Sequence, residues 1–185
     1  HEMEPLRYEG GSRIENRKLE QVHVIFGLPT VSYTDDSFYD LQVFNTLLGG
    51  GMSSRLFQEI REKRGLVYSV YSFSSHYVDG GLFSIYAGTG ANDIGELMPV
   101  MCDELVRATE DLSEEEVTRA RAQLKASVVM AMESNSGRCE TLARQIQIFG
   151  RPQSMEEIVG KIDAVDLESV RRSGKALLDG KPTIT

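Results

Sequence analysis

Two pairs of residues with the same spacing have the chemistry to act on a peptide carbonyl group. Seven positions separate Arg61 from Tyr68, and seven separate Arg64 from Tyr71. A guanidinium and a phenol hydroxyl can both donate hydrogen bonds to an oxygen that gains negative charge. On a regular strand Tyr68 and Tyr71 point to opposite faces, so we expect at most one pair to serve a common site. The spacing does not choose between the pairs, and solvated arginines with half-buried tyrosines would fit it equally well.

A run of three glycines, Gly49, Gly50 and Gly51, precedes these pairs. A phosphate-binding P-loop would need a Lys followed by Ser or Thr after the glycines, and the dinucleotide-binding spacing fails because Ser54 replaces its third glycine. The run therefore indicates a tight turn between two helices, with Ser53 capping the second helix. It also leaves backbone groups that an extended peptide could bind, and both interpretations stay open.

The histidines and cysteines form no recognisable metal-binding motif. The histidines are His1, His23 and His76, and neither H-E-x-x-H nor H-x-x-E-H occurs. We therefore predict no metal site in this chain, and structural or surface roles for the histidines. The two cysteines, Cys102 and Cys139, lack the C-x-x-C spacing and are expected to be buried small apolar residues.

Length and composition indicate one globular domain. The 185 residues are 41% hydrophobic and 26% charged, which suffices for a core of ordinary size. No apolar run approaches about 18 residues, so we predict no membrane-spanning helix. The net charge of -8 disfavours nucleic acid as a partner, because binding it requires clustered Lys and Arg. Since the chain lacks an initial Met and ends in what reads as a shortened strand, we expect residues 1–185 to be one domain of a longer protein.

Hydrophobic periodicity predicts an α+β domain. We expect an irregular lead-in over 1–17, a hairpin turn at 78–81, and a capping box formed by Ser113 and Glu116. Thr34 or Asp35 is expected to cap the first helix. The expected strands cover 19–28, 66–78, 82–87 and a stretch after 180, and the expected helices cover 34–49, 53–64, 92–110, 113–132, 136–149, 154–162 and 166–178. Because the helices are clustered between antiparallel strands, we expect them on one face of a mainly antiparallel sheet.

Several separated blocks carry a family resemblance. They are "LLGGGMSSRLFQEIREKRGLVYSVYSF", "GLFSIYAGT" and "RARAQLKASVVMAMESNSGRCETLARQIQIFGRP". In this order they resemble the C-terminal half of insulinase/pitrilysin-type zinc peptidases, and most closely the bacterial processing proteases related to mitochondrial processing peptidase. The resemblance runs from about Tyr8 to the last residue. It implies an α+β domain with a sheet of about six strands, forming one half of a clamshell that closes over a substrate peptide.

The resemblance also implies roles for individual residues. The family pattern R-x-x-x-x-L-x-Y is met by "REKRGLVY", which selects Arg61 and Tyr68. Tyr68 would donate a hydrogen bond to the scissile carbonyl or the oxyanion, and Arg61 would help to hold that region or the peptide backbone. The run Gly49, Gly50 and Gly51 occupies the place of the glycine-rich loop of the processing peptidase's regulatory subunit, although it is shorter here.

The zinc of such a peptidase would be bound outside this chain. In the family, the N-terminal half carries the H-x-x-E-H motif and a distal Glu. The resemblance therefore implies part of a zinc metalloendopeptidase that is inactive alone, with an N-terminal zinc-binding half or a second subunit as partner, and a homodimer as one possible assembly. Relatives that serve as non-catalytic scaffolds, such as the core subunits of respiratory complex III, leave a second interpretation open.

Overall fold

The computed structural model describes residues 6–185, so His1 lies outside the described part. It contains one open sheet of five strands in the order β1-β5-β2-β4-β3. Neighbouring strands are antiparallel except β1 and β5, which pair in parallel. The strands are β1 (Gly11–Ser12), β2 (Val22–Thr30), β3 (Val67–His76), β4 (Gly81–Thr89) and β5 (Thr183–Ile184). The predicted α+β class with a mainly antiparallel sheet is confirmed, with five strands in residues 6–185 where about six were expected.

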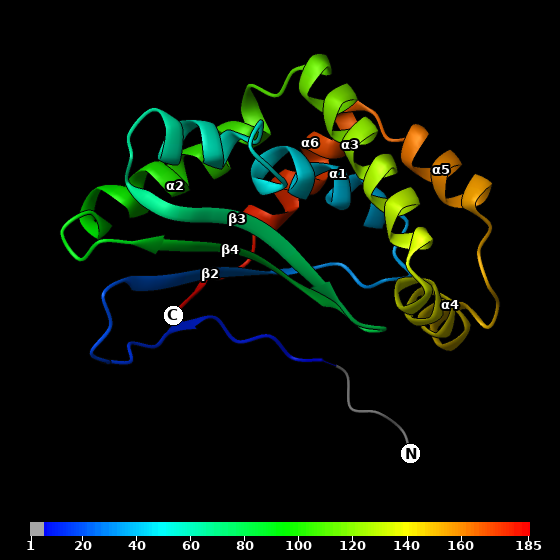
Figure 1. Cartoon of the computed structure of the whole chain (residues 1–185), viewed down its shortest axis with the longest axis horizontal. Helices are drawn as coiled ribbons and strands as arrows, with labels where there is room; N and C mark the ends of the chain where they lie inside the picture. Colours follow the sequence, from blue (N-terminus) through cyan, green and yellow to red (C-terminus); the bar gives the residue numbers. More distant parts are fainter. Residues whose placement is uncertain (1–5) are drawn as a thin grey trace.

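The helices pack on one face of the sheet, with α4 and α5 toward the end where β3 stops (Figure 1). They are α1 (Phe38–Gly49), the π-helix η1 (Phe57–Glu62), α2 (Ile94–Glu110), α3 (Glu114–Glu133), α4 (Asn135–Phe149), α5 (Met155–Asp163) and α6 (Leu167–Leu178). Within residues 6–185 none of these helices is both long and apolar enough to cross a membrane. The opposite face of the sheet carries no helix in this part of the chain, which leaves its side chains open to a ligand or partner.

The core lies between the sheet and the helices. Phe83 and Ile85 of β4 are buried against Phe44 of α1, and the ring centroids of Phe44 and Phe83 lie 6.2 Å apart. Leu97 and Met101 extend this cluster from α2. Full burial of a side chain of this size stabilises a fold by about 1.5–3 kcal/mol. This cluster therefore holds α1 and α2 firmly against the strands from which the site is built.

The first residues of β3 form a bulge. The pairing register with β4 shifts between Val67 and Ser69, so Tyr68 is the extra residue on β3. Val67 is buried on the helix side, whereas Tyr68 and Tyr71 are both exposed. The bulge interrupts the regular alternation on which the expectation of opposite faces for Tyr68 and Tyr71 rested, and burial does not separate the two residues.

The segment after α1 is tied to the start of α3. Ser113 and Glu116 form the predicted capping box, which is confirmed. Glu116 also accepts hydrogen bonds from Arg55 at 2.6 and 2.8 Å, and Arg55 pairs with Asp111 as well. Only 13% of the Arg55 side chain and 18% of the Glu116 side chain are exposed. Burial raises the pKa of Glu116, but the hydrogen bonds from Arg55 and Ser113 outweigh this effect and leave its pKa below the ordinary value.

Other local expectations differ from the structure. The expectation that Thr34 or Asp35 caps the first helix is wrong, because α1 begins at Phe38 after the N-cap residue Ser37. Asp35 instead accepts hydrogen bonds from the backbone and hydroxyl of Ser37, at 2.9 and 2.6 Å, in the turn ahead of α1. The helix expected over 53–64 is present as the π-helix η1, and the lead-in expected to be irregular contains the two-residue strand β1. Cys102 is half-buried and Cys139 is exposed, so the expectation that both are buried is wrong. Cys139 is exposed because α4 packs loosely on the domain, with Gln145 as its one buried residue.

The burial and hydrogen bonds of His76 lead us to expect that the stability of the domain depends on pH. Its Nδ1 lies 2.8 Å from the carbonyl oxygen of Val31 and must donate, so Nε2 of the neutral ring accepts from the side-chain amide of Gln42 at 2.9 Å. Burial lowers the pKa of His76. In the unfolded chain His76 has its ordinary pKa of about 6.5. As the pH falls below this value, His76 of the unfolded chain therefore binds a proton before His76 of the folded chain does. The free energy of unfolding should fall by up to about 1.4 kcal/mol per pH unit as the pH drops below this value.

Urea unfolding at several pH values measures this effect. His76→Gln should reduce the slope of the free energy of unfolding against pH, between pH 7 and the lowered pKa of His76. His23→Gln, a substitution on the exposed face of β2, should retain this slope. An unchanged slope in His76→Gln would remove His76 from the explanation.

Candidate functional site

A capped turn fixes the separation between Arg61 and Tyr68. Gly65 has a φ of +64°, the left-handed conformation that glycine adopts without strain. Its N–H donates to the carbonyl of Arg61 at 3.1 Å, and the N–H of Leu66 donates to the carbonyl of Ile60 at 3.1 Å. These bonds end η1 and turn the chain directly into β3. The two predicted catalytic residues therefore lie on either side of one rigid turn.

Tyr68 is positioned by the bulge of β3. Its side chain is 62% exposed, although β3 is anchored by buried residues on both sides of it. Within residues 6–185 its hydroxyl makes no hydrogen bond to another protein group. The phenol is thus presented to solvent from a rigid strand, an arrangement in which a bulge can aim a side chain at a ligand.

Arg61 is available for a ligand, whereas Arg64 is not. The guanidinium of Arg61 lies 5.0 Å from the centroid of the Phe57 ring, and no carboxylate of the described residues lies within 4.0 Å of it. Arg64 instead pairs with Glu59 at 3.0 Å and with Glu96 at 3.8 Å. A stacked arginine keeps its full charge and its donors. Arg61 and Tyr68 share no hydrogen bond in this structure, and both face solvent.

Tyr71 belongs to an aromatic cluster on the helix-free face that sequence reasoning missed. Its ring centroid lies 5.0 Å from that of Tyr86 and 5.9 Å from that of Phe73. The hydroxyl of Tyr86 in turn lies 2.7 Å from Nδ1 of His23. The cluster depends on the cross-strand register that places Tyr71 opposite Tyr86, a contact for which the linear sequence gave no signal. At 45% exposure Tyr71 is less free than Tyr68.

The glycine run is a tight turn in which each glycine has a different environment. Gly49 ends α1 against β3, where a Cβ would lie 2.5 Å from Oγ of Ser72 and also collide with the Ser72 backbone nitrogen. The carbonyl of Gly50 accepts a hydrogen bond from Gln123 of α3 at 2.6 Å. The carbonyl of Gly51 accepts from the backbone of Ser54 at 3.0 Å. Gly50 and Gly51 are exposed, but their carbonyl groups are already engaged within the domain.

The described residues do not fit a zinc site. Within residues 6–185 no group of three or more His, Cys, Asp or Glu side chains is placed to hold a metal ion. His23 is bonded to Tyr86, and His76 is bonded to Val31 and Gln42, so each histidine of the described part has a structural partner. No zinc chemistry can therefore be derived from these residues.

The fold is the α+β domain that the family resemblance implies. The family model of the Peptidase M16 inactive domain matches residues 2–124, and this chain belongs to that family. An uncharacterized zinc protease of Streptomyces coelicolor is 38% identical over 181 residues, which cover 97% of this chain and 39% of the relative. The uncharacterized zinc protease YmxG of Bacillus subtilis is 35% identical over 162 residues, which cover 87% of this chain and 40% of the relative. The chain thus spans about two fifths of the length of these relatives.

Solved structures confirm the fold. A conserved protein from Enterococcus faecalis V583 matches with a TM-score of 0.79 at 25% identity, covering 98% of this chain and 42% of that one. A peptidase M16 inactive domain from Pseudomonas fluorescens matches with a TM-score of 0.77 at 23% identity, covering 89% and 40%. A chain of complex III from Candida albicans matches with a TM-score of 0.85 at 21% identity, covering 96% and 45%. The predicted membership in the zinc peptidase family is confirmed.

Proposed function

We propose that this chain is the C-terminal, non-zinc-binding domain of a zinc-dependent metalloendopeptidase. In this role it holds the substrate peptide and donates a hydrogen bond to the reacting carbonyl oxygen. The zinc would be bound by an N-terminal half or by a second subunit, since residues 6–185 do not supply its ligands. The names of the relatives support the class of enzyme, and the exposed phenol of Tyr68 at the bulge of β3 is the observation that carries the proposed role.

This chain would contribute two side chains to the proposed chemistry, and the zinc would come from the other half or subunit. The O–H of Tyr68 would donate to the oxygen that becomes negative when the peptide carbonyl is attacked, and one such donor contributes about 10²–10³ in turnover. Arg61, without a carboxylate partner in the described part, would pair with a carbonyl or carboxylate of the substrate. In the glycine run we assign any peptide contact to the N–H of the exposed Gly51, which makes no hydrogen bond within residues 6–185. Gly49 is packed on Ser72, and Gly50 already donates to Thr46 and accepts from Gln123.

Peptide hydrolysis by the full-length protein tests this function. We expect cleavage of an unstructured peptide, loss of cleavage after treatment with a chelator, and recovery when zinc is added back. The 185-residue chain alone should cleave nothing and retain no stoichiometric zinc in metal analysis. One zinc per purified 185-residue chain, or cleavage by the full-length protein that survives chelation, would contradict the proposal.

A non-catalytic scaffold is the competing function. It requires the same fold, so the likeness to the complex III chain, at 21% identity, does not distinguish the two. A scaffold has no use for a solvent-facing phenol or for a guanidinium that lacks a carboxylate partner within residues 6–185, and the presence of both Tyr68 and Arg61 favours the peptidase. Full-length protein that binds peptides or subunits but shows no zinc-dependent cleavage would support the scaffold.

A further inference from the structure

A cavity of about 610 Å³ lies on the helical side of the domain, in a region that the proposed peptidase role does not use. It is bounded by the turn before α1, the first residues of α1, the second half of α3, and parts of α4 and α5. None of the residues Arg61, Tyr68 or Gly49 to Gly51 lines it. A cavity of this size matches the volume of a small-molecule site, which is typically about 300–1,000 Å³.

Aromatic and aliphatic side chains form most of the cavity wall. Phe38 stacks on Tyr33 with ring centroids 4.8 Å apart and meets Tyr39 edge-on at 5.0 Å. Phe149 of α4 and Val128 of α3 add half-buried apolar surface from other sides. The interlocked rings keep this wall rigid, so the cavity is suited to the apolar body of a ligand.

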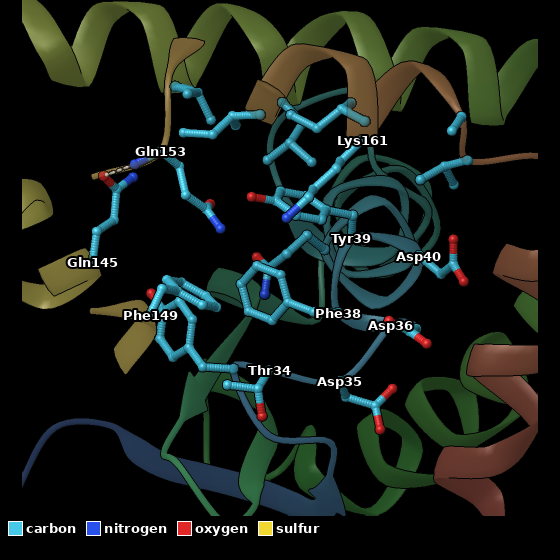
Figure 2. A pocket seen from close by; sticks show the side chains of 18 of the residues that line it. Thr34, Asp35, Asp36, Phe38, Tyr39, Asp40, Gln145, Phe149, Gln153 and Lys161 are labelled. Carbon is cyan, nitrogen blue, oxygen red and sulfur yellow. Dashed lines mark hydrogen bonds between the residues drawn. The ribbon is translucent and has the colours of Figure 1, made fainter. Parts of the chain in front are cut away.

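Hydrogen-bond donors converge above this apolar wall. Lys161, Tyr39 and Gln153 extend toward the centre of the cavity from different elements (Figure 2). The ammonium group of Lys161 lies 5.8 Å from the centroid of the Tyr39 ring, and no carboxylate of residues 6–185 lies within 4.0 Å of it. Burial raises the pKa of Tyr39, which keeps its hydroxyl a donor at neutral pH. Gln145, which is buried, accepts a hydrogen bond from the backbone N–H of Gln153 at 2.9 Å and orders that residue.

The carboxylates at this cavity do not neutralise Lys161. Asp35, Asp36 and Asp40 line its edge but point away from Lys161 (Figure 2). Asp40 accepts a hydrogen bond from Ser169 at 2.8 Å, and Asp35 is engaged with the turn before α1. Glu157, one turn before Lys161 on α5, is bonded by both terminal guanidinium nitrogens of Arg151, at 2.6 and 2.9 Å. The cavity therefore presents two cations, the exposed Lys161 and Arg144, whose guanidinium donates to the hydroxyl of Tyr33 at 3.0 Å.

We propose that this cavity binds a carboxylate attached to an apolar body, with Lys161 and Tyr39 holding the carboxylate and the Phe38 and Phe149 rings contacting the body. Two sources share this chemistry, namely a free aromatic or branched aliphatic acid and the C-terminal residue of a peptide. An ammonium group makes a charge-assisted hydrogen bond with a carboxylate that is stronger than a neutral one, and the neutral donors satisfy the second carboxylate oxygen. This site is separate from the proposed peptidase role and does not depend on it.

Titration of the 185-residue chain with 4-phenylbutyrate and with N-acetyl-Gly-Phe, followed by NMR or calorimetry, tests the proposal. We expect saturable binding at micromolar to millimolar concentrations, and no binding of N-acetyl-Gly-Phe-amide, which lacks the carboxylate. Lys161→Met should weaken binding by about tenfold or more, and Tyr39→Phe by a smaller factor, since hydrogen bonds to charged groups are the stronger ones. Lys175→Met, an exposed lysine of α6 outside the cavity, is the matched control and should bind as the unchanged chain does.

The outcomes distinguish a free acid from a peptide C-terminus as the ligand, and they also show whether the proposal fails. Binding of both probes identifies a site for small acids, and binding of the peptide probe alone identifies a site for peptide C-termini. Equal affinity for the amide, equal affinity in Lys161→Met, or no saturable binding of either acid would overturn the proposal. Because proteolysis is not the readout, none of these results depends on whether the full-length protein is a peptidase.

Discussion

Replacing Tyr68 by Phe in the full-length protein should lower turnover by about 10²–10³ while changing KM little. The substitution removes one hydroxyl and retains the ring, so the fold of β3 should be unaffected. Tyr68 is exposed and makes no hydrogen bond within residues 6–185, which means that its hydroxyl has no structural partner to lose. Its proposed partner is the oxygen of the reacting carbonyl, which is most negative in the transition state. Steady-state hydrolysis of a peptide by the zinc-loaded full-length protein measures the effect.

The chain offers matched controls for this experiment. Tyr71→Phe removes a hydroxyl from the neighbouring exposed tyrosine of the same strand, and it should leave turnover near that of the unchanged protein. Arg61→Ala should weaken cleavage, whereas Arg64→Ala should not, because Arg64 is engaged with Glu59 and Glu96. Unchanged turnover in Tyr68→Phe, or equal losses in Tyr68→Phe and Tyr71→Phe, would remove the proposed role of Tyr68.

The sequence, through its family resemblance, proposes Arg61 and Tyr68 as the candidates but does not describe their geometry. The pattern R-x-x-x-x-L-x-Y distinguishes Arg61 and Tyr68 from the second pair with the same spacing. That both tyrosines are exposed follows from the bulge at Tyr68, which depends on pairing with β4 and so on contacts far away in sequence. The same limit applies to Arg55, whose bonds to Asp111 and Glu116 join segments that are distant along the chain.

The elements themselves were largely predictable because their signals are local. Alternation predicted β2, the hairpin signal at 78–81 predicted β4 as the returning strand, and the capping box predicted the first residue of α3. Errors occurred where packing decides the outcome. Cys139 lies on an amphipathic stripe of α4, yet α4 packs loosely and leaves that residue exposed. The two-residue strand β1 exists only because β5 lies next to it, and two residues carry no periodicity of their own.

The glycine run provides the second large effect, on stability. We expect Gly49→Ala to lower the free energy of unfolding by about 1–3 kcal/mol. The new Cβ would lie 2.5 Å from Oγ and 2.8 Å from Cβ of Ser72, and it would also collide with the Ser72 backbone nitrogen. Since Ser72 is held in β3 by pairing with β4, and its hydroxyl donates to the carbonyl of Asn45 at 2.9 Å, relief requires α1 and β3 to move apart. Urea unfolding of the 185-residue chain measures the loss.

Gly51→Ala separates this packing effect from a general intolerance of the turn. A Cβ at Gly51 would meet only the side-chain amide nitrogen of Gln123, at 3.0 Å, which is the far end of a flexible side chain. Its backbone has no positive φ, so alanine adopts it without backbone strain and restricts the unfolded chain. The Gln123 amide, which donates to Gly50, must shift by a few tenths of an ångström, so the loss of stability should be much smaller than at Gly49. Equal losses at both positions would mean that the turn needs glycine throughout. A loss confined to Gly49 would assign that glycine to packing and leave the exposed Gly51, whose N–H makes no hydrogen bond within residues 6–185, as the part of the run that can contact a peptide.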